Sequence, residues 1–599
     1  MRSASCRNVF FSISSSFCAA LVLIATALVF ATPSFAQVSF QPSTHTSPNL
    51  PSDIFQADLN NDGKPDLITN GGNMVSIFLN NGDGTFPAGP SATYPTSGVS
   101  ASTVVAGDFD EDGLQDIATG NCGDSPDPPQ TPVPPSVSIL FNAGGGTFKP
   151  HVDYPIPACP DSIGRIIALP NSLFSLVVSY GGSTITILQN DGTGHFTERT
   201  IAGPAGSFFG GVSTGDYNGD SLQDIAAIMS TPGSSVQQVV IFYQNGDGSF
   251  GPPTTVFSMA AGLASTNTVG FNSTSLPDLL VPFNNAANEP PGVIALANQG
   301  GGVFNAIKLH VDSSYLIGHK AAEGDLQGTG LHSIIVPIMF LDSFNNLFGA
   351  FAVFFQQSKG AFLGPFYYAG DAGGSPGAVV VADFNGDGRK DFAAAGGEDN
   401  HLLIYQNNTT AATCPFFSNA GVHVCAPGSG ARVTSPVAIA AAAQGTPFPI
   451  VAMKAYIDGN QVASADNNTL NAAVAKVAGT HQLAVNAWDP NGKVYQTIVN
   501  FTVGSAATCS IPSTAGVHIC APAAGSTVSS PVAISAAANG GTAKISAMKA
   551  YIDSKLVASS TSGALTGSAP EAAGTHKLTV NAWNTAGKLF QSTATFTVH

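Results

Sequence analysis

Four copies of one aspartate-rich loop dominate the chain. In every copy, Asp or Asn occupies positions 1, 3, 5 and 9, and an apolar segment typical of a β-strand follows at once. The copies are Asp58-Leu-Asn60-Asn-Asp62-Gly63-Lys64-Pro-Asp66, Asp108-Phe-Asp110-Glu-Asp112-Gly113-Leu114-Gln-Asp116, Asp216-Tyr-Asn218-Gly-Asp220-Ser221-Leu222-Gln-Asp224 and Asp383-Phe-Asn385-Gly-Asp387-Gly388-Arg389-Lys-Asp391. The spacing predicts a tight loop that leads into a strand.

The side chains in these loops offer only oxygen ligands, which suits Ca2+ better than Zn2+ or copper. Position 7 can add a backbone carbonyl, from Lys64, Leu114, Leu222 and Arg389. An EF-hand would carry a bidentate Glu at position 12. That position holds Thr69, Thr119, Ala227 and Ala394. We therefore expect about four Ca2+ sites, each in a β-hairpin and none in an EF-hand, with all five odd-numbered positions of each loop as ligands.

Weaker copies fill the gaps between the full loops. Residues 270–280 keep the closing Asp278, residues 325–335 keep the first Asp325, and residues 165–178 keep only the apolar strands. Each unit then shows an alternating strand, an Asn/Gly turn and a Phe, as in Val75 to Phe86, which predicts a hairpin. Seven units of four antiparallel strands suggest a β-propeller. Residues 38–46 resemble the missing last strand, so we expect them to complete the seventh blade and remove its open edge.

These units resemble FG-GAP/VCBS repeats, which form the blades of integrin-α-type propellers. The resemblance covers about residues 38–410. It is strong at the four full loops and weak in blades three, five and six, so the metal prediction is confined to the full loops. The resemblance implies a propeller domain spanning residues 37–410.

Two copies of another module follow, at residues 411–504 and 505–599. Ala420-Gly-Val-His423-Val-Cys425 in the first matches Ala515-Gly-Val-His518-Ile-Cys520 in the second. Short alternating strands over about 90 residues predict a β-sandwich. The modules resemble bacterial Ig-like domains. The two tryptophans, Trp488 and Trp583, are expected in their cores. The pairs His423/His481 and His518/His576 are either metal ligands or strand-surface histidines, and we favour the second interpretation.

Residues 1–36 read as a signal peptide, with Arg2 and Arg7 before an apolar run and Ala36 at the cleavage site. Six cysteines remain in the exported chain, and their repeated spacing predicts the pairs Cys414/Cys425 and Cys509/Cys520. Cys122 and Cys159 then pair by elimination, and free buried thiols are the alternative. The chain has a net charge of −17 and no cluster of basic residues in its sequence, so we do not expect it to bind nucleic acid. Later segments are too short in apolar sequence to insert in a membrane.

The overall prediction is an all-β chain, a seven-bladed propeller followed by two Ig-like sandwiches. Calcium loops would occupy one face, and the other would carry connections of variable length, at 125–135, 284–291 and 340–348. Phe344 and Phe348 are exposed contacts there or are partly buried. Gly373-Gly-Ser375-Pro-Gly377 fits a serine-hydrolase pattern, but Pro376 and the absence of a following helix favour chance.

We therefore expect a secreted or cell-surface recognition protein, not an enzyme, that binds an extracellular glycan or protein; the periplasm is the alternative location. A secreted polysaccharide lyase or hydrolase, and a non-catalytic scaffold of a surface assembly, are the alternative functions.

Overall fold

The computed structural model describes residues 38, 40–48, 50–98, 100–124, 132–168, 173–260, 262–272, 274–284, 289–343, 345–372, 374, 376–396, 400–408, 414, 419–433, 435–504, 509–528 and 532–598. The signal-peptide prediction for residues 1–36 lies outside them. Within these ranges every regular element is a strand, which confirms the all-β prediction. No helix of the described chain is long and apolar enough to cross a membrane.

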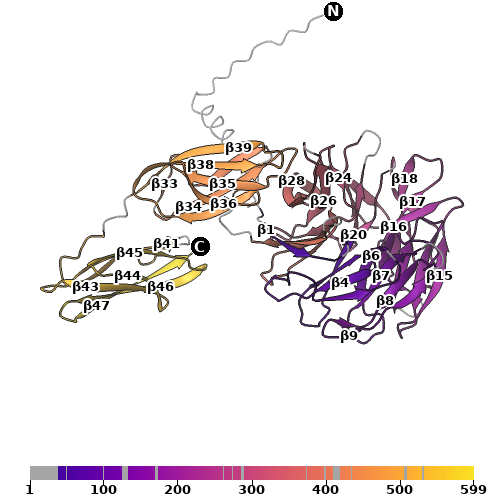
Figure 1. Cartoon of the computed structure of the whole chain (residues 1–599), viewed down its shortest axis with the longest axis horizontal. Helices are drawn as coiled ribbons and strands as arrows, with labels where there is room; N and C mark the ends of the chain where they lie inside the picture. Colours follow the sequence, from indigo (N-terminus) through magenta and orange to yellow (C-terminus); the bar gives the residue numbers. More distant parts are fainter. Residues whose placement is uncertain are drawn as a thin grey trace, which may run out of the picture.

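The N-terminal part forms seven sheets of antiparallel strands, which we name blades 1 to 7. In Figure 1 they make the ring that runs from indigo to orange. Blade 1 consists of β2 (Asp53–Ala57), β3 (Asp66–Gly71), β4 (Met74–Phe78) and β5 (Ala92–Pro95). Blade 2 consists of β6 (Ser100–Gly107), β7 (Asp116–Cys122), β8 (Ser136–Leu140) and β11 (Val152–Pro155), with a small hairpin of β9 (Asn142–Gly144) and β10 (Thr147–Phe148).

Blades 3 to 5 repeat this order. Blade 3 consists of β12 (Ser162–Ala168), β13 (Leu173–Ser179), β14 (Thr184–Asn190) and β15 (Phe196–Ala202). Blade 4 consists of β16 (Phe208–Gly215), β17 (Asp224–Ser230), β18 (Val236–Phe242) and β19 (Thr254–Ala260). Blade 5 consists of β20 (Asn267–Val269), β21 (Asp278–Phe283), β22 (Gly292–Asn298) and β23 (Phe304–His310).

Blade 6 has an interrupted first strand, made of β24 (Leu316–Ile317) and β25 (Ala322–Gly324), followed by β26 (Ser333–Leu341), β27 (Leu347–Ser358) and β28 (Ala361–Ala372). Blade 7 consists of β29 (Pro376–Ala382), β30 (Asp391–Gly396), β31 (His401–Asn407) and β1 (Phe40–Thr46). The strand β1 pairs with β31 from Phe40 opposite Asn407 to Thr46 opposite His401. The N-terminal segment therefore completes the last sheet, as its sequence predicts.

The sheets pack face to face in a closed circuit. A separate apolar core lies between each pair of neighbours, and the core that closes the ring joins Ile54 and Leu67 of blade 1 to Phe384 and Ile404 of blade 7. The remaining interfaces have equivalent cores. The innermost strands also contact one another around the whole ring. The second strand of each blade is buried along most of its length, because neighbouring sheets cover both of its faces.

Two sandwiches follow, seen in Figure 1 in orange and in yellow. The first packs β32 (Gly421–Ala426), β34 (Val437–Gln444) and β37 (Thr469–Val474) against a second sheet of β33 (Arg432–Val433), β39 (Val494–Val503), β38 (Gly479–Trp488), β35 (Ala452–Ile457) and β36 (Asn460–Ala465). The second packs β40 (Gly516–Ala521), β42 (Val532–Asn539) and β45 (Ala564–Ala569) against β41 (Thr527–Val528), β47 (Leu589–Val598), β46 (Gly574–Asn584), β43 (Ile545–Ile552) and β44 (Lys555–Ser560). Their strand orders are identical.

The tryptophans correct one expectation. Leu483, Val485 and Ala487 of β38 point into the first sandwich core, so Trp488 has the opposite parity and lies half-buried on the outer face of the sheet. Lys454 lies over its ring at 5.7 Å. Trp583 occupies the equivalent half-buried place in the second sandwich. Neither tryptophan is a core residue.

Candidate metal centre

The four aspartate-rich loops join the first two strands of blades 1, 2, 4 and 7. In the blade 1 loop, the Asp58 carboxylate accepts the amides of Asp62 at 3.0 Å and Gly63 at 2.8 Å. Asn60 accepts the Asp62 amide at 3.0 Å, and Asp62 accepts the Lys64 amide at 3.0 Å. These bonds turn the chain around the side chains at positions 1, 3 and 5, because Asp and Asn readily bond to backbone two or more residues onward.

The other three loops repeat this arrangement. Asp108, Asp216 and Asp383 each accept the amides of positions 5 and 6. Asp112, Asp220 and Asp387 each accept the amide of position 7, which belongs to Leu114, Leu222 and Arg389. Asn218 and Asn385 accept the amide of position 5, as Asn60 does. The structure thus gives all four predicted loops one conformation.

Two positions of each loop require left-handed backbone. Position 6 has a positive φ of 82° at Gly63, 87° at Gly113 and 85° at Gly388, which glycine adopts without strain. In blade 4 the same position is Ser221, with φ of 69°. A residue with a Cβ is strained there. Ser221 is therefore the one non-glycine residue at position 6. Position 4 is also left-handed, with φ of 61° at Asn61 and 59° at Glu111, whereas the other two loops have Gly219 and Gly386 there.

The closing aspartates, Asp66, Asp116, Asp224 and Asp391, are fully buried. In blade 1, Asp66 accepts the amides of Leu59 at 2.9 Å and Asn80 at 2.8 Å, so it joins the loop to the end of the third strand. Burial is the main cause that raises the pKa to about 6 for Asp66, Asp224 and Asp391, and to about 7 for Asp116. The neighbouring carboxylates raise it further, while the backbone hydrogen bonds oppose these effects. A bound cation would hold these groups ionised.

The donor set fits a calcium ion best in blade 2. One carboxylate oxygen each from Asp108, Asp110 and Asp116 lies within 4.8 Å of the others. Two oxygens on opposite sides of one Ca2+ are about 4.8 Å apart, since each lies about 2.4 Å from the ion. Oδ1 of Asp110 is buried without a hydrogen-bond partner. A buried oxygen acceptor of this kind normally has a partner, and a hard cation would supply it.

The weaker loops keep parts of the frame. In blade 6, Asp325 accepts the amides of Thr329 at 3.0 Å and Gly330 at 2.6 Å, as Asp58 does for its own loop, although Asp325 is its only carboxylate. In blade 5, Asp278 accepts the amides of Phe271 and Asn298. The corresponding turn of blade 3, at 169–172, lies outside the described residues.

An Asn or Gln that recurs in the blades, near the end of the third strand, links neighbouring blades. From the sequence alone it is assigned only to a turn. Asn142, just after the third strand of blade 2, donates from Nδ2 to the Leu59 carbonyl at 2.9 Å and to the Gln115 carbonyl at 3.0 Å. Leu59 is position 2 of the blade 1 loop. Equivalent bonds to the loop of the preceding blade are made by Asn80 to Phe384, Asn190 to Phe109, Asn298 to Tyr217, Gln356 to Phe271 and Asn407 to Leu326. We call these contacts the blade clasps.

In the described part of the sandwiches, two of the four histidines considered as metal ligands, His481 and His576, use both ring nitrogens in bonds to protein groups, so neither ring has a free nitrogen for a metal. His481 bonds through Nδ1 to Asp458 at 2.7 Å and through Nε2 to the Val477 carbonyl at 2.9 Å. His576 makes the same pair of bonds, to Asp553 at 2.7 Å and to the Ala572 carbonyl at 2.8 Å. Each acceptor needs an N–H, so this geometry favours the doubly protonated ring. The hydrogen bond to the aspartate is the main cause that raises the pKa of both histidines.

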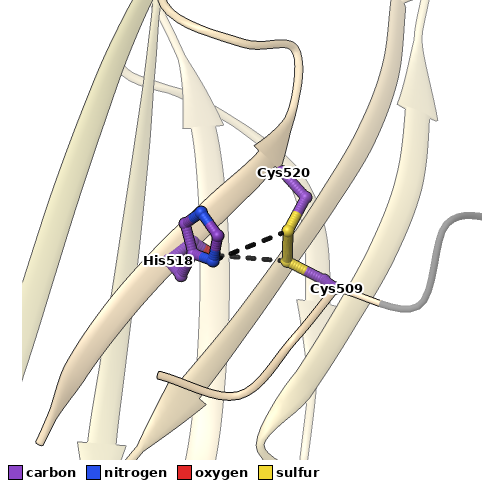
Figure 2. Close-up of side chains that lie close together, drawn as sticks. All are labelled: Cys509, His518 and Cys520. Carbon is purple, nitrogen blue, oxygen red and sulfur yellow. Dashed lines mark hydrogen bonds between the residues drawn. A yellow bond between two sulfur atoms is a disulfide. The ribbon is translucent and has the colours of Figure 1, made fainter. Parts of the chain in front are cut away.

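Cys509, His518 and Cys520 also lie close together, as Figure 2 shows. The two sulfur atoms form a disulfide, so neither is the thiolate that a metal would bind. The predicted pairs Cys122–Cys159 and Cys414–Cys425 are likewise disulfides. All three pairing predictions are confirmed.

The first sandwich docks on blade 6. Phe448 packs against Phe340 with ring centroids 5.1 Å apart, and the Tyr315 hydroxyl donates to the Pro447 carbonyl. The Ser343 amide donates to Asn491 at 2.8 Å. Phe348 is half-buried and stacked on Phe340, so it is not a free contact residue.

Several sequence predictions fall wholly or partly outside the described residues. These are Phe344, much of the 125–135 and 284–291 connections, and Gly373 and Ser375 of the hydrolase-like pattern. Pro376 and Gly377 of that pattern begin a strand, β29, and not the helix that a nucleophile elbow requires.

Comparison with known proteins identifies two parts of the chain. Residues 58–119, which hold the first two full loops, match the FG-GAP-like repeat, and residues 516–580 match the bacterial Ig domain. No curated protein matches the chain. A solved structure described as fibronectin(III)-like modules of Clostridium thermocellum CbhA is 16% identical and covers 30% of this chain and 93% of its own, with a TM-score of 0.13. The chain therefore contains an FG-GAP-like repeat at the start of its ring of sheets and a bacterial Ig domain near its end.

Proposed function

We propose that this chain is an exported, calcium-stabilised recognition or adhesion protein that binds an extracellular glycan or protein. The observation that carries the proposal is the division of the ring into two faces. The four oxygen-rich loops share the face where the first and second strands of each blade meet. The opposite face carries connections of unequal length, from 72–73 in blade 1 to 123–135 in blade 2. Loops that differ in this way on a rigid scaffold are where recognition usually occurs.

Calcium has a structural role in this proposal. Each full loop is held at position 2 twice, by a blade clasp to its carbonyl and by the closing aspartate to its amide, so an ion bound within the loop would stabilise the junction between two sheets. A site occupied at about 100 times its dissociation constant adds about 2.7 kcal/mol to the free energy of unfolding. Four such sites would be large beside the usual margin of about 5–15 kcal/mol for a domain. The ion stabilises the scaffold and does not itself contact the ligand.

Export agrees with the three disulfides, since such bonds persist in oxidising compartments. We propose secretion or display at the cell surface, with the periplasm as the alternative compartment. We also propose that the protein has no catalytic activity. Turnover of any member of a panel of acidic and neutral polysaccharides would contradict this and favour a lyase or hydrolase.

The test is a binding screen of purified protein on immobilised glycans and matrix proteins, with and without EGTA. Melting curves in the same buffers separate lost stability from lost contact. A variant with the 123–135 connection shortened should lose binding and keep its melting temperature. Glu198→Ala, on the exposed outer strand of blade 3, is the matched control and should bind normally. Binding that survives the shortening of every long connection on this face would refute the proposal.

A further inference from the structure

The ring encloses two cavities along its axis. The smaller has a volume of about 480 Å³ and is lined by parts of the blade 1 and blade 2 loops. The larger, of about 810 Å³, is lined mainly by the innermost strands and extends to the other face. The two share the waist residues Phe55, Gln56, Arg165, Lys320 and Val380. A volume of this size is typical of small-molecule sites.

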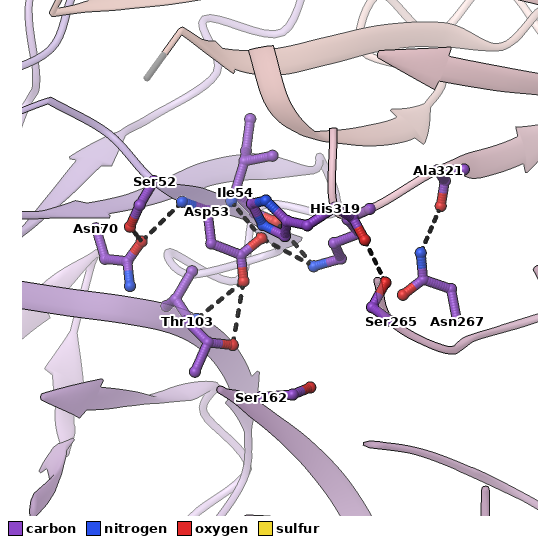
Figure 3. A network of polar contacts seen from close by, with 12 residues as sticks. Ser52, Asp53, Ile54, Asn70, Thr103, Ser162, Ser265, Asn267, His319 and Ala321 are labelled. Carbon is purple, nitrogen blue, oxygen red and sulfur yellow. Dashed lines mark hydrogen bonds and ion pairs between the residues drawn. The ribbon is translucent and has the colours of Figure 1, made fainter. Parts of the chain in front are cut away.

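Lys320 contributes no net charge to this waist. Its Nζ lies 3.2 Å from Oδ1 of Asp53, which is buried and also accepts hydrogen bonds from Thr103 and from two backbone amides. Figure 3 shows this network beside His319. Burial opposes ionisation of Asp53, but Lys320 and the amides together hold the pKa of Asp53 below its usual value. Burial lowers the pKa of His319, which is therefore neutral.

Arg165 carries the positive charge that is not matched. One N–H donates to the Ala106 carbonyl at 2.7 Å, and the guanidinium lies 5.4 Å from the Phe55 ring centre and 6.0 Å from that of Phe174. In the described part of the chain no carboxylate lies within 4.0 Å of it. A guanidinium has five N–H donors in a planar fork. Arg165 therefore faces both cavities with donors and charge to spare.

The other carboxylates that line the cavities do not neutralise Arg165. Asp58 accepts two amides of its own loop, and Glu323 pairs with His332. Asp161 also lines the larger cavity, but among the described residues it does not lie within 4.0 Å of the Arg165 guanidinium. Of the two cationic side chains at the waist, Lys320 is paired with Asp53, and Arg165 has no ion-pair partner in the described part of a chain whose total charge is −17. That balance favours a ligand with a single negative charge.

The wall of the larger cavity offers hydrogen-bond acceptors. Five of its hydroxyls donate their own protons to backbone carbonyls of neighbouring blades, and Figure 3 shows Ser265 doing so to His319. The others are Ser162 to Val212, Thr214 to Arg165, Thr266 to Gly211 and Thr268 to Thr214. A hydroxyl that has donated its proton keeps only lone pairs for a ligand. Thr266 also accepts from Ser213 at 3.0 Å, and Thr268 accepts from the Tyr217 hydroxyl at 2.7 Å, so each of these two oxygens keeps one lone pair. Such a wall complements a ligand rich in O–H groups.

We propose that this channel binds a sugar acid, with its carboxylate on Arg165 and its hydroxyls on the Ser/Thr wall. The planar fork of Arg matches a carboxylate through two parallel hydrogen bonds. A doubly charged group such as a phosphate monoester would need a second free cation, and Lys320 is already paired. The site is distinct from the outer loop face, so the inference stands whether or not that face binds a glycan or protein.

The experiment is calorimetric titration of the calcium-loaded full chain with D-glucuronate, D-glucose, acetate and sulfate. We expect saturable binding of glucuronate and much weaker binding of glucose, which lacks the carboxylate, and of acetate, which lacks the hydroxyls. Arg165→Gln should weaken glucuronate binding about tenfold to a hundredfold, the range for a lost charge-assisted hydrogen bond. Thr268→Val should weaken glucuronate and leave acetate unchanged.

Arg199→Gln is the matched control. Arg199 also donates to a carbonyl, that of Gly248 at 2.8 Å, and lies over a Phe ring at 5.7 Å, but it lines neither cavity. It should bind glucuronate as the wild type does, and melting curves verify that all variants are folded. The proposal is overturned if wild type gives no saturable signal with glucuronate, which would mean a channel filled by solvent only. Equal binding by wild type and Arg165→Gln, or sulfate binding as tight as glucuronate, would overturn it too.

Discussion

The blade clasps make a quantitative prediction through Asn142→Leu. Leucine has the same branched arrangement of four side-chain heavy atoms as asparagine, but it cannot donate to the Leu59 and Gln115 carbonyls or accept the Gly144 amide at 2.9 Å. Asn142 itself is 1% exposed. Water cannot easily replace the donor at such a site, and each buried group left without a partner costs about 1–3 kcal/mol. Two carbonyls give a loss of about 2–6 kcal/mol in the free energy of unfolding.

Differential scanning calorimetry in calcium buffer is the suitable assay. Both tryptophans lie in the sandwiches, so their fluorescence does not follow the ring. The second sandwich, at 516–598, serves as an internal reference whose transition should not move. Asn81→Leu is the control, because Asn81 is exposed and bonds only to the adjacent turn through Thr85. An exposed substitution of this kind changes stability by about 0.5 kcal/mol or less.

A clear result would refute this reasoning. If Asn142→Leu and Asn81→Leu lowered the ring transition equally, the clasp would contribute nothing beyond ordinary surface contacts. Because Leu59 belongs to the blade 1 loop, calcium titration of Asn142→Leu should also show weaker binding at one class of site. An unchanged calcium titration with a large loss of stability would mean that the clasp joins the sheets without shaping the loop.

Four further outcomes are expected. EGTA should lower the melting temperature of the ring and leave the second sandwich unchanged, as judged by calorimetry. Ser221→Gly should raise stability by about 1 kcal/mol by removing a left-handed non-glycine residue, even in EGTA. Phe40→Ala should lower the free energy of unfolding by about 3–5 kcal/mol, because the Phe40 ring packs edge-on against Tyr368 and Phe392. Phe86→Tyr keeps the aromatic ring and should cost less. Because the pKa of His481 is raised in the folded state, its contribution to folding stability is complete below pH about 6.5 and is lost as pH rises through the folded-state pKa. Tryptophan fluorescence should therefore show lower sandwich melting temperatures in alkaline buffer. His481→Asn should make this pH dependence weaker.

The loops could be predicted from the sequence because their determinants are local. The Asp58 carboxylate bonds to amides only four and five residues onward, so the spacing of side chains specifies the turn. The closing strand could also be predicted, since Phe40 repeats a pattern found after the third strand of other units. One recurring sequence pattern therefore predicted both the repeated four-stranded units and the N-terminal strand that completes the seventh blade.

The clasps were missed because their partners are far apart in the chain. Asn142 and Leu59 are separated by 83 residues and belong to different blades. The available signal was an Asn or Gln near the end of every third strand, as at Asn80 and Asn142 just after it and at Asn298 as its last residue. Such a residue also suits an ordinary turn, so the pattern alone does not separate the two roles. The prediction that Trp488 lies in the core was wrong for a different reason. It relied on the large apolar side chain of tryptophan, although Leu483 and Val485 set an alternation along the strand that places Trp488 on the outer face.

Docking of the first sandwich covers part of the face of the ring that carries the connections of unequal length. Phe340 and Tyr315 belong to the core between blades 5 and 6, and Phe448 and the Pro447 carbonyl of the sandwich contact them there. The sandwich is therefore attached to the ring through aromatic packing as well as through the chain, and a hinge at that point would expose these rings to water. In Figure 1 the blades that carry β7, β15 and β18 lie on the other side of the ring from the sandwich. A large ligand on this face should contact blades 2 to 4, where the Cys122–Cys159 disulfide joins the longest connection to the start of blade 3. The larger cavity is lined by Cys159 as well as by Arg165. The accessible part of the face with the connections of unequal length therefore leads into the channel that contains Arg165.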